Sequence, residues 1–452
     1  MSAESSAAYA GTARSAELHA AARRFLPAGV TGDGRYFAPY PIAFASAHGK
    51  HLRDVDGNQY LDYHGGFGTA VLGYSHPEVD RAVAQATSDA GTFVGLSHPY
   101  EQALAERLCR ILPLADRVAL CGGGGSDAVY HAVRLARAAT GRTKIVKIEG
   151  GYQGWHADVG VSTRPSLRDT SKVRSPQGIP NSPGSLAAVS AEVFVAPEND
   201  REGLAQLFAQ HGRDIAGLIM EPVLYSSGCV RVDREFLQLA RELCTASGSV
   251  LIFDEVMSGF RAALEGAGER LGVTADLGCF GKAVANGYIL AILAGREELM
   301  CRLTPEGDVF YSGTFNGHPL SVAAAMATLD VLERDAVPAR IDALGELLAM
   351  GVNAAIAELG LRAVCQTFGS VWNLYFNTNA VCDYRDLAAS SGPATGQLNA
   401  AYLTYLRERG IYIHTRHVNR AFISAQHDEA DIDRTIAVIR GFLEEHASEL
   451  TA

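Results

Sequence analysis

The stretch that decides the fold is 249-SVLIFDEVMSGFRAALEGAGERLGVTADLGCFGKAVANGYILAILAG-295. It begins with an apolar run, 250–253, that stops at Asp254 and Glu255. Four apolar residues bounded by charges are typical of a buried strand in a parallel sheet. In α/β sheets, ligands bind beyond the carboxyl ends of such strands. The sequence therefore predicts that Asp254 lies beside a ligand.

The middle of the chain alternates between strand-like and helix-like segments. Strands are predicted at 117–121, 144–148, 191–195, 215–220, 249–254 and 289–294, and helices near 126–139, 200–211, 233–247 and 319–333. This alternation predicts an α/β fold with a mostly parallel sheet covered by helices on both faces. The Ser-, Pro- and Gly-rich stretch 157–187 interrupts the rhythm and is too long for a structural connection, so we expect an active-site loop.

The length of 452 residues exceeds one ordinary hydrophobic core, and we expect three parts. Residues 1–75 are predicted to form a helix and a hairpin that pack with the small domain and the active site. Residues 76–333 are predicted to form the large ligand-binding domain. Residues 334–452 change to a long helix, short strands and a final helix, which predicts a smaller α+β domain.

Composition excludes several classes of protein. A hydrophobic content of 48% with 20% charged residues is that of a soluble globular protein, and a net charge of −11 argues against nucleic-acid or membrane partners. No apolar run reaches the roughly 18 residues that span a bilayer, and the N-terminus lacks a secretory signal core. The eight cysteines form no CxxC pair and the fourteen histidines no HExxH motif, so no metal site is predicted. We expect a cytoplasmic protein with small-molecule substrates.

Lys282 lies between Gly281 and an Ala-Val-Ala run. A lysine in so apolar a setting should be desolvated, which lowers its pKa and makes its amine nucleophilic. Together with Asp254, it suits a pyridoxal phosphate (PLP) site, where the lysine forms a Schiff base and the acid pairs with the protonated pyridine nitrogen. From these two residues alone, a helix-capping acid and a solvated lysine remain open alternatives.

A glycine-rich loop, 120-LCGGGGSD-127, lies between a predicted strand and a predicted helix. Consecutive glycines let backbone N–H groups close around an anion, and the N-terminus of the helix adds its positive dipole end. The Ser126 hydroxyl can donate one more hydrogen bond. The loop therefore suits the phosphate of PLP.

The same loop leaves two alternatives. Gly123-x-Gly125-x-x-Ala128 fits a dinucleotide fingerprint, and Glu149 ends the following strand at roughly the required distance. This pattern would make the protein an NAD-dependent oxidoreductase. A glycine-rich turn without a ligand is the third interpretation.

Over nearly its whole length the chain resembles the class III aminotransferases of PLP fold type I. The motifs are DVDG (54–57), HP (76–77), GSDA (125–128), GYQGW (151–155), EPV (221–223), DEVMSGFR (254–261), GK (281–282) and GTFNGHP (313–319). The most similar subgroup contains glutamate-1-semialdehyde aminomutase and the D-phenylglycine-type aminotransferases. The resemblance implies a large domain with a mostly parallel sheet and a smaller α+β domain built from both ends of the chain.

The resemblance also implies roles around the cofactor ring. Lys282 would form the Schiff base and shuttle protons, and Asp254 would pair with the pyridine nitrogen. Val256 and Tyr152 would pack on the two faces of the ring, and Glu221 would lie near the site.

Further roles concern the phosphate and the second subunit. Gly125 and Ser126 would bind the phosphate, and Thr314 would complete the phosphate site from the partner subunit of a homodimer.

The substrate side is where the sequence departs from the family. The resemblance places Arg35 at the substrate carboxylate and Phe67 in the pocket, and Arg416 is a further substrate candidate. Asn419 stands where the aminomutase has a glutamate, which weakens a glutamate-semialdehyde assignment, and 422–427 looks closer to the D-phenylglycine type. We therefore expect intermolecular amino-group transfer between an amino acid and an oxo acid, with an aromatic or cyclic partner suggested, through pyridoxamine phosphate. Intramolecular aminomutase chemistry is the alternative.

Overall fold

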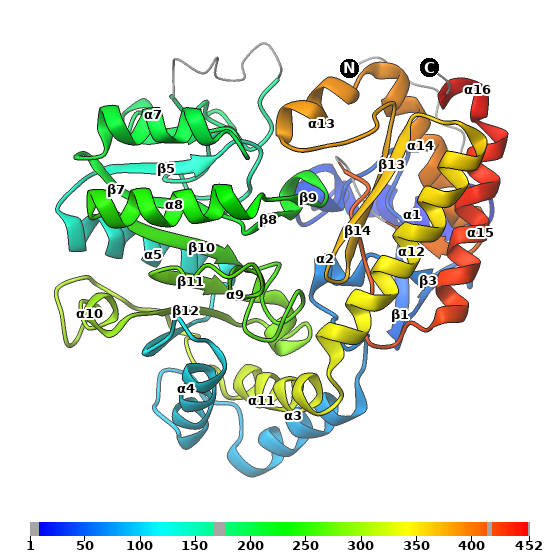
Figure 1. The fold of residues 1–452 in the computed structure, drawn as a ribbon. Coiled ribbons are helices and arrows are strands. Elements are labelled where there is room, and N and C mark those ends of the chain that lie inside the picture. The colour runs from blue at the N-terminus through cyan, green and yellow to red at the C-terminus, as the bar shows by residue number, and fades with distance from the viewer. Residues whose placement is uncertain (1–8, 167–176, 414–417, 451–452) are drawn as a thin grey trace.

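The central feature of the fold is a seven-stranded sheet. The structure, a computed structural model, describes residues 9–166, 177–413 and 418–450. The strands lie in the order β4 (Arg117–Cys121), β12 (Ala291–Gly295), β11 (Leu277–Phe280), β10 (Val250–Glu255), β7 (Ile215–Met220), β5 (Lys144–Ile148) and β6 (Val193–Ala196) (Figure 1). Strand β12 runs antiparallel to both of its neighbours, and the other neighbouring pairs are parallel. The predicted α/β fold with a mostly parallel sheet is confirmed.

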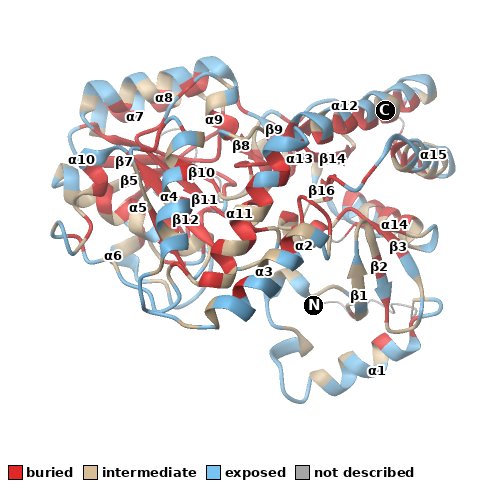
Figure 2. Cartoon of the chain, turned by 90° about the horizontal axis from the view of Figure 1, so that it is seen from below, coloured by how far each residue is buried: buried red, intermediate tan, exposed pale blue. Residues whose placement is uncertain are grey.

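Helices cover both faces of this sheet. Val250 and Ile252 of β10 belong to the core on the side of α5 (Gly125–Thr140), whereas Leu251 and Phe253 pack with α7 (Arg201–His211) and α8 (Arg234–Ser247). Every residue of β10 is buried, and the sheet forms the buried interior in Figure 2. A strand buried on both faces needs apolar side chains in both directions, which is why the sequence shows a continuous apolar run.

The remaining helices include one group around the sheet and one near the C-terminus. They are α1 (Ala13–Ala22), α2 (Gly65–Gly68), α3 (Pro77–Ala90), α4 (Pro99–Ile111), α6 (Ala187–Ser190), α9 (Ala267–Arg270), α10 (Glu297–Met300), α11 (Pro319–Arg334), α12 (Val337–Leu359), α13 (Tyr384–Ser390), α14 (Pro393–Glu408), α15 (Glu429–Glu445) and α16 (Ala447–Leu450). Within the described residues, no helix combines the length and apolarity that crossing a membrane requires.

Two smaller sheets join the ends of the chain. Strands β1 (Phe44–His48), β2 (His51–Asp54) and β3 (Gln59–Asp62) confirm the predicted hairpin, and β15 (Ile411–Tyr412) pairs in parallel with β3. Strands β13 (Ala363–Phe368), β14 (Val371–Phe376) and β16 (Ala421–Phe422) form an antiparallel sheet, and β8 (Val223–Leu224) pairs with β9 (Val230–Arg231). Segments from both ends of the chain thus share one sheet, while the predicted boundaries at 75 and 333 stay predictions.

The sequence did not predict strand β11 or helices α13 and α14. The β11 residues, Leu-Gly-Cys-Phe, are few and include a glycine, so they lack a strong strand pattern. The pairing with β10 creates this strand, and it brings Lys282 to the edge where Asp254 lies. Of the predicted loop 157–187, residues 167–176 lie outside the described part of the chain.

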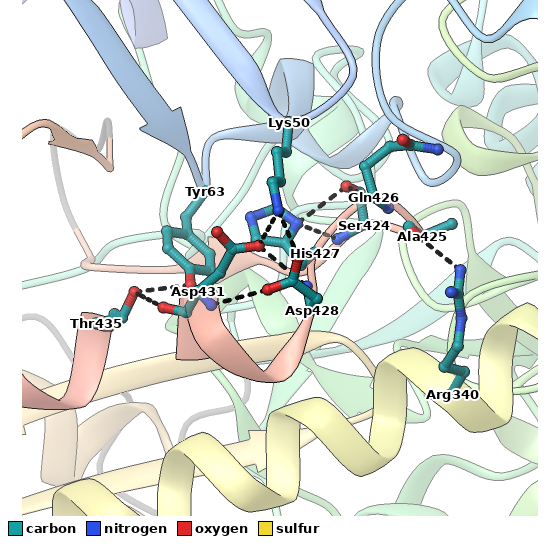
Figure 3. A network of polar contacts seen from close by, with 10 residues as sticks. All are labelled: Lys50, Tyr63, Arg340, Ser424, Ala425, Gln426, His427, Asp428, Asp431 and Thr435. Atoms are coloured by element: carbon teal, nitrogen blue, oxygen red, sulfur yellow. Dashed lines mark hydrogen bonds and ion pairs between the residues drawn. The ribbon is translucent and has the colours of Figure 1, made fainter. Parts of the chain in front are cut away.

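A polar network attaches the N-terminal strands to α15 (Figure 3). Lys50 Nζ donates to Asp428 Oδ2 at 2.8 Å and to Asp431 Oδ2 at 2.5 Å, and these two acids also cap the start of α15. The Tyr63 and Thr435 hydroxyls lie 2.8 Å apart. Charge and hydrogen bonding therefore fix the position of the N-terminal hairpin against the C-terminal helix.

His427 is buried at the centre of this network. Its Nδ1 accepts a hydrogen bond from the Ser424 N–H at 3.1 Å, and its ring lies 4.6 Å from the Tyr63 ring. Burial lowers the pKa of His427 to about 4, because the charged imidazolium loses water; the Asp431 carboxylate opposes this shift and Lys50 adds to it.

This burial predicts a pH dependence of stability. The unfolded chain takes up a proton at His427 below about pH 6.5, whereas the folded chain resists protonation down to about pH 4. The free energy of unfolding should therefore fall from pH 6.5 to pH 4 by on the order of 3 kcal/mol through this residue. His427→Gln should remove this fall in the free energy of unfolding, which is measured by denaturant titration at several pH values. His211→Gln, on α7, is the control and should keep the pH dependence of the parent protein. An unchanged pH dependence of the free energy of unfolding in His427→Gln would contradict the prediction.

Candidate functional site

Asp254 and Lys282 lie at the same edge of neighbouring strands. Asp254 pairs with Cys279 in the register of β10 with β11, and Lys282 follows two residues after β11 ends. Lys282 begins the short 3-10 turn η4 (Lys282–Ala285) with φ +44°. A non-glycine residue in this left-handed region is uncommon and is held there by its surroundings, as at many functional sites.

Burial shifts both groups toward their neutral forms. The pKa of Asp254 is raised, mainly by burial and then by the Glu221 carboxylate. The pKa of Lys282 is lowered, mainly by burial and then by the positive charge of Arg420. A neutral amine is the nucleophilic form of lysine. Lys282 can therefore attack an aldehyde at neutral pH.

The Asp254 carboxylate is placed to receive a cation. Its Oδ1 accepts a hydrogen bond from the Val256 N–H at 3.1 Å, and no described residue forms an ion pair with it. A buried acid without a charged partner gains stability when a positive group binds beside it, because that group restores ionisation. A protonated pyridine nitrogen is such a group.

Glu221 connects a second loop to the lysine. It follows β7 directly, is buried, and accepts hydrogen bonds from the Tyr152 N–H at 3.4 Å and from the Ser226 N–H at 3.0 Å. Burial raises its pKa, and Ser226, Arg420 and Lys282 oppose that shift. The carboxylate thus fixes the backbone of Tyr152 close to the Lys282 charge.

Val256 brings the glycine loop to the same place. A Cβ added to Gly125 would lie 2.6 Å from Val256 Cγ1, and one added to Gly281 would lie 3.5 Å from the same atom. The Val256 side chain therefore lies between the start of α5 and the turn that carries Lys282. Only a residue without a side chain fits at position 125.

The start of α5 has the features of a phosphate site. Gly124 has φ +92°, and a Cβ there would meet no atom within 4 Å, so space is open beside the first N–H groups of this 16-residue helix. The Tyr152 phenol forms a hydrogen bond with Ser126, which opposes the rise in its pKa caused by burial. Open space, helix N–H groups and a hydroxyl suit an anionic phosphate. The residues present therefore fit PLP at both of its ends.

The acid that a dinucleotide site would use, Glu149, is already engaged in an ion pair. Glu149 is buried, and its Oε2 accepts a hydrogen bond from Arg385 Nε at 2.8 Å within an ion pair. A carboxylate engaged in this way is not available to bind a ribose hydroxyl.

The substrate candidates Arg35 and Phe67 lie near each other. A Cβ on Gly34 would be 3.5 Å from the end of the Phe67 ring. Arg35 is exposed and donates from Nη1 to the Thr31 hydroxyl at 2.5 Å, and Phe67 has φ +58°. The backbone beside Arg35 thus lies against the Phe67 ring, whereas the Arg35 guanidinium bonds to Thr31.

Their connection to the lysine runs through a buried arginine. Arg261 donates from Nη2 to the Gly68 carbonyl, next to Phe67, and from Nη1 to the Ser370 hydroxyl at 2.7 Å. Its positive charge also lowers the pKa of Lys282.

The segment that carries Thr314 contacts the glycine loop. Thr314 is exposed, on the segment whose Asn316 Oδ1 accepts a hydrogen bond from the Gly122 N–H at 2.8 Å. Arg416 lies outside the described residues.

Sequence reasoning missed Arg420, just before β16. It donates from Nη1 to the Tyr225 carbonyl at 2.5 Å, and burial lowers its pKa to about 10. Its charge acts on both Lys282 and Glu221. The only signal in the sequence was its place beside Asn419, where the chain departs from the family pattern.

Comparisons with known proteins agree with this geometry. The profile of the family "Aminotransferase class-III" matches residues 35–430. A protein of Rhodopirellula baltica named glutamate-1-semialdehyde 2,1-aminomutase is 39% identical over 419 residues, which are 92% of each chain. An omega-transaminase from Sphaerobacter thermophilus superposes with a TM-score of 0.88 at 29% identity, covering 97% of this chain and 98% of the other. A structure described as a transaminase with PLP bound gives a TM-score of 0.87 at 31% identity, covering 98% and 99%. The fold is thus PLP fold type I, as predicted.

The contact between Gly125 and Val256 can be tested by substitution. In Gly125→Ala, the new Cβ would overlap Val256, and overpacking of this kind costs about 1–3 kcal/mol. The affinity for PLP, measured by absorbance titration, should fall between about fivefold and a hundredfold. Adding Val256→Ala should restore part of the affinity.

The matched control is Gly396→Ala. Gly396 lies on α14, and a Cβ there would meet nothing within 4 Å, so PLP affinity should not change. Equal PLP affinity in Gly125→Ala and the parent would show that α5 does not begin at the cofactor.

Proposed function

The chain belongs to the class III aminotransferases, and on that premise we propose that it moves an amino group with PLP held by Lys282 and Asp254. The observation that carries the proposal is the pair itself, a desolvated amine and a desolvated carboxyl at the ends of neighbouring strands. When bound, PLP supplies an electron sink that stabilises negative charge on the carbon bearing the amino group.

The chain's own residues bind the cofactor and move the protons. Lys282 binds the cofactor covalently and, once released, moves protons to and from the substrate carbon with its Nζ. Asp254 keeps the pyridine nitrogen protonated. Tyr152 and Val256 would pack against the ring, and Glu221 positions the Tyr152 backbone.

The phosphate and the substrate carboxylate are held by separate groups. Gly125 and Ser126 bind the phosphate at the start of α5, and Thr314 reaches it from a partner subunit. Arg35 and Phe67 contact the substrate, together with Arg416. Arg420 adds a cation whose charge already acts at Lys282.

Of the two forms of the reaction, the relatives favour the intramolecular one. The Rhodopirellula baltica protein, at 39% identity, is named an aminomutase, whereas the two solved transaminases are 29% and 31% identical. This ranking reverses the expectation from the sequence, which put intermolecular transfer first. We therefore propose an amino shift within one amino aldehyde of the glutamate-1-semialdehyde type.

Intermolecular transfer is the second candidate. Asn419 departs from the aminomutase pattern, and the adjacent Arg420 can hold the carboxylate of an amino donor or an oxo-acid acceptor by a bidentate contact. Both solved structures described above are transaminases by name.

The first test separates PLP chemistry from the alternatives. The purified protein should show an absorbance band near about 410–430 nm that disappears in Lys282→Ala, with loss of at least about a thousandfold in turnover, because the covalent link and the proton carrier are both removed. A colourless protein that binds NAD would contradict the proposal.

The second test separates the two forms of the reaction. Glutamate-1-semialdehyde supplied alone, with no oxo acid added, should be converted to an isomer of the same mass, which is separated from it by chromatography before mass spectrometry. Turnover that stops after one equivalent per site and resumes on addition of an oxo acid would assign intermolecular transfer instead.

The homodimer also remains a proposal, supported by exposed apolar surface. Trp155 is 78% exposed, Phe310 65%, Phe315 58% and Ile289 68%. Large apolar side chains in such number near the glycine loop and Lys282 are typical of surfaces that a partner covers.

Mixed dimers test whether Thr314 acts across the interface. Lys282→Ala and Thr314→Glu should each be inactive alone, the second because the new carboxylate repels the phosphate. A mixture that exchanges subunits should recover up to about a quarter of parental activity, since half of the dimers then hold one intact site. Absence of recovery, with exchange verified by a tag, would place Thr314 in its own subunit's site.

A further inference from the structure

A second buried lysine, Lys147, has no place in the mechanism described above. It lies on β5, and its side chain is fully buried. Within the described residues, the hydrogen bonds of its amine go to two backbone carbonyls and none goes to a carboxylate. Burial lowers the pKa of Lys147 to about 7, and the Glu221 and Glu149 carboxylates oppose this shift. Because an amine is costly to bury, its presence calls for a role that an apolar side chain could not fill.

The two hydrogen bonds of this amine join the ends of one loop. Lys147 Nζ donates to the Gly151 carbonyl at 2.8 Å and to the Val161 carbonyl at 2.6 Å. The segment between them, 151–161, carries Tyr152. A protonated amine has three N–H groups and a neutral amine has two, so both bonds persist in either form. Lys147 can therefore hold the loop without a counter-ion.

The Gly151 carbonyl belongs to the peptide group that joins Gly151 to Tyr152. The N–H of the same peptide group, at Tyr152, donates to Glu221 Oε1 at 3.4 Å. One planar peptide group is therefore held at its oxygen by Lys147 and at its nitrogen by Glu221. Hydrogen bonds at the two ends of a peptide group polarise it and strengthen each other. The orientation of this group sets the direction in which the Tyr152 side chain leaves the backbone.

The central sheet brings the lysine and the acid to this one peptide group. Lys147 pairs with Ile219 in the register of β5 with β7, and Glu221 follows β7 directly. At its other end, the Tyr152 phenol forms a hydrogen bond with Ser126 at the start of α5. Tyr152 is therefore held at its backbone by two neighbouring strands and at its hydroxyl by the proposed phosphate site.

We propose that Lys147 is a positioning residue, which orients the 151–152 peptide group together with Glu221 and so sets the Tyr152 ring against the cofactor. Its effect on the cofactor is exerted through Tyr152. The inference rests on the proposed PLP-dependent function and holds for both forms of the reaction. It gives the buried amine of Lys147 a role distinct from that of Lys282, which binds the cofactor covalently.

Hydrogen exchange in the cofactor-free protein tests the hold on the loop. Lys147→Met keeps the length of the side chain and removes its N–H donors, so two buried carbonyls lose their partner. Amide exchange over 150–161 should become about tenfold faster, because local opening of the loop becomes easier. Lys144→Met is the matched control on the same strand, since Lys144 Nζ donates to the Ala191 carbonyl at 2.9 Å, outside the loop. Equal exchange over 150–161 in Lys147→Met and the parent would overturn the inference.

A double-mutant cycle tests whether the effect passes through Tyr152. The dissociation constant of PLP follows from titration of the absorbance band in the parent, Lys147→Met, Tyr152→Ala and the double variant. Lys147→Met should weaken PLP binding by about tenfold when Tyr152 is present, and by less than about twofold in the Tyr152→Ala protein. An equal loss in both backgrounds, as expected of a residue that only stabilises the fold, or a loss in neither would overturn the inference.

A second substitution covers the case in which Lys147→Met yields no folded protein. Lys147→Gln keeps N–H donors on a shorter side chain, and its effect on PLP binding should show the same dependence on Tyr152 in the same cycle. The parent protein separates the two levels of the assignment. Absence of the Lys282-dependent band in the parent would overturn the proposed function itself, whereas a normal band with equal losses in both backgrounds would overturn only the role of Lys147.

Discussion

The register between β10 and β11 is the constraint on which the site depends. Parallel pairing sets Asp254 opposite Cys279, so that the chain leaves β11 at the same edge and places Lys282 beside the acid. Both groups are then withdrawn from water, which pushes each toward its neutral form. The fold meets the cost of this burial through the apolar packing of the strands on both faces.

From that edge, two side chains extend the site outward. Val256 fills the space between Gly125 and Gly281, which sets the distance between the glycine loop and the lysine. Glu221 accepts hydrogen bonds from the Tyr152 and Ser226 N–H groups and so joins the loops that carry these two residues. In each case a single side chain joins two segments that are distant in sequence.

The residues proposed to contact the substrate come from other segments of the chain. Arg35 and Phe67 come from the N-terminal segment, whose strands share a sheet with β15 and are held to α15 by Lys50. Arg420 precedes β16. Because these segments come from separate parts of the fold, their charges can change without disturbing the strands that hold Asp254 and Lys282.

Helix and strand periodicity predicted most of the large sheet and its helices, since those elements are long and bury regular apolar faces. It failed for β11 and α14. Strand β11 has four residues, one of them a glycine, and exists because β10 and β12 pair with it on either side. Helix α14 begins at the proline of a Ser-Gly-Pro stretch, and its buried positions are few.

By itself the sequence determined the cofactor chemistry, because the acid at a strand end, the lysine after a glycine and the glycine loop are local patterns with local physical meaning. The tertiary structure decided which cations act on Lys282. Arg420 carries no distinctive local pattern, and its importance arises from its burial and from the action of its charge on Glu221 and Lys282. Burial and charge pairing depend on segments far apart in the chain, so folding alone reveals them.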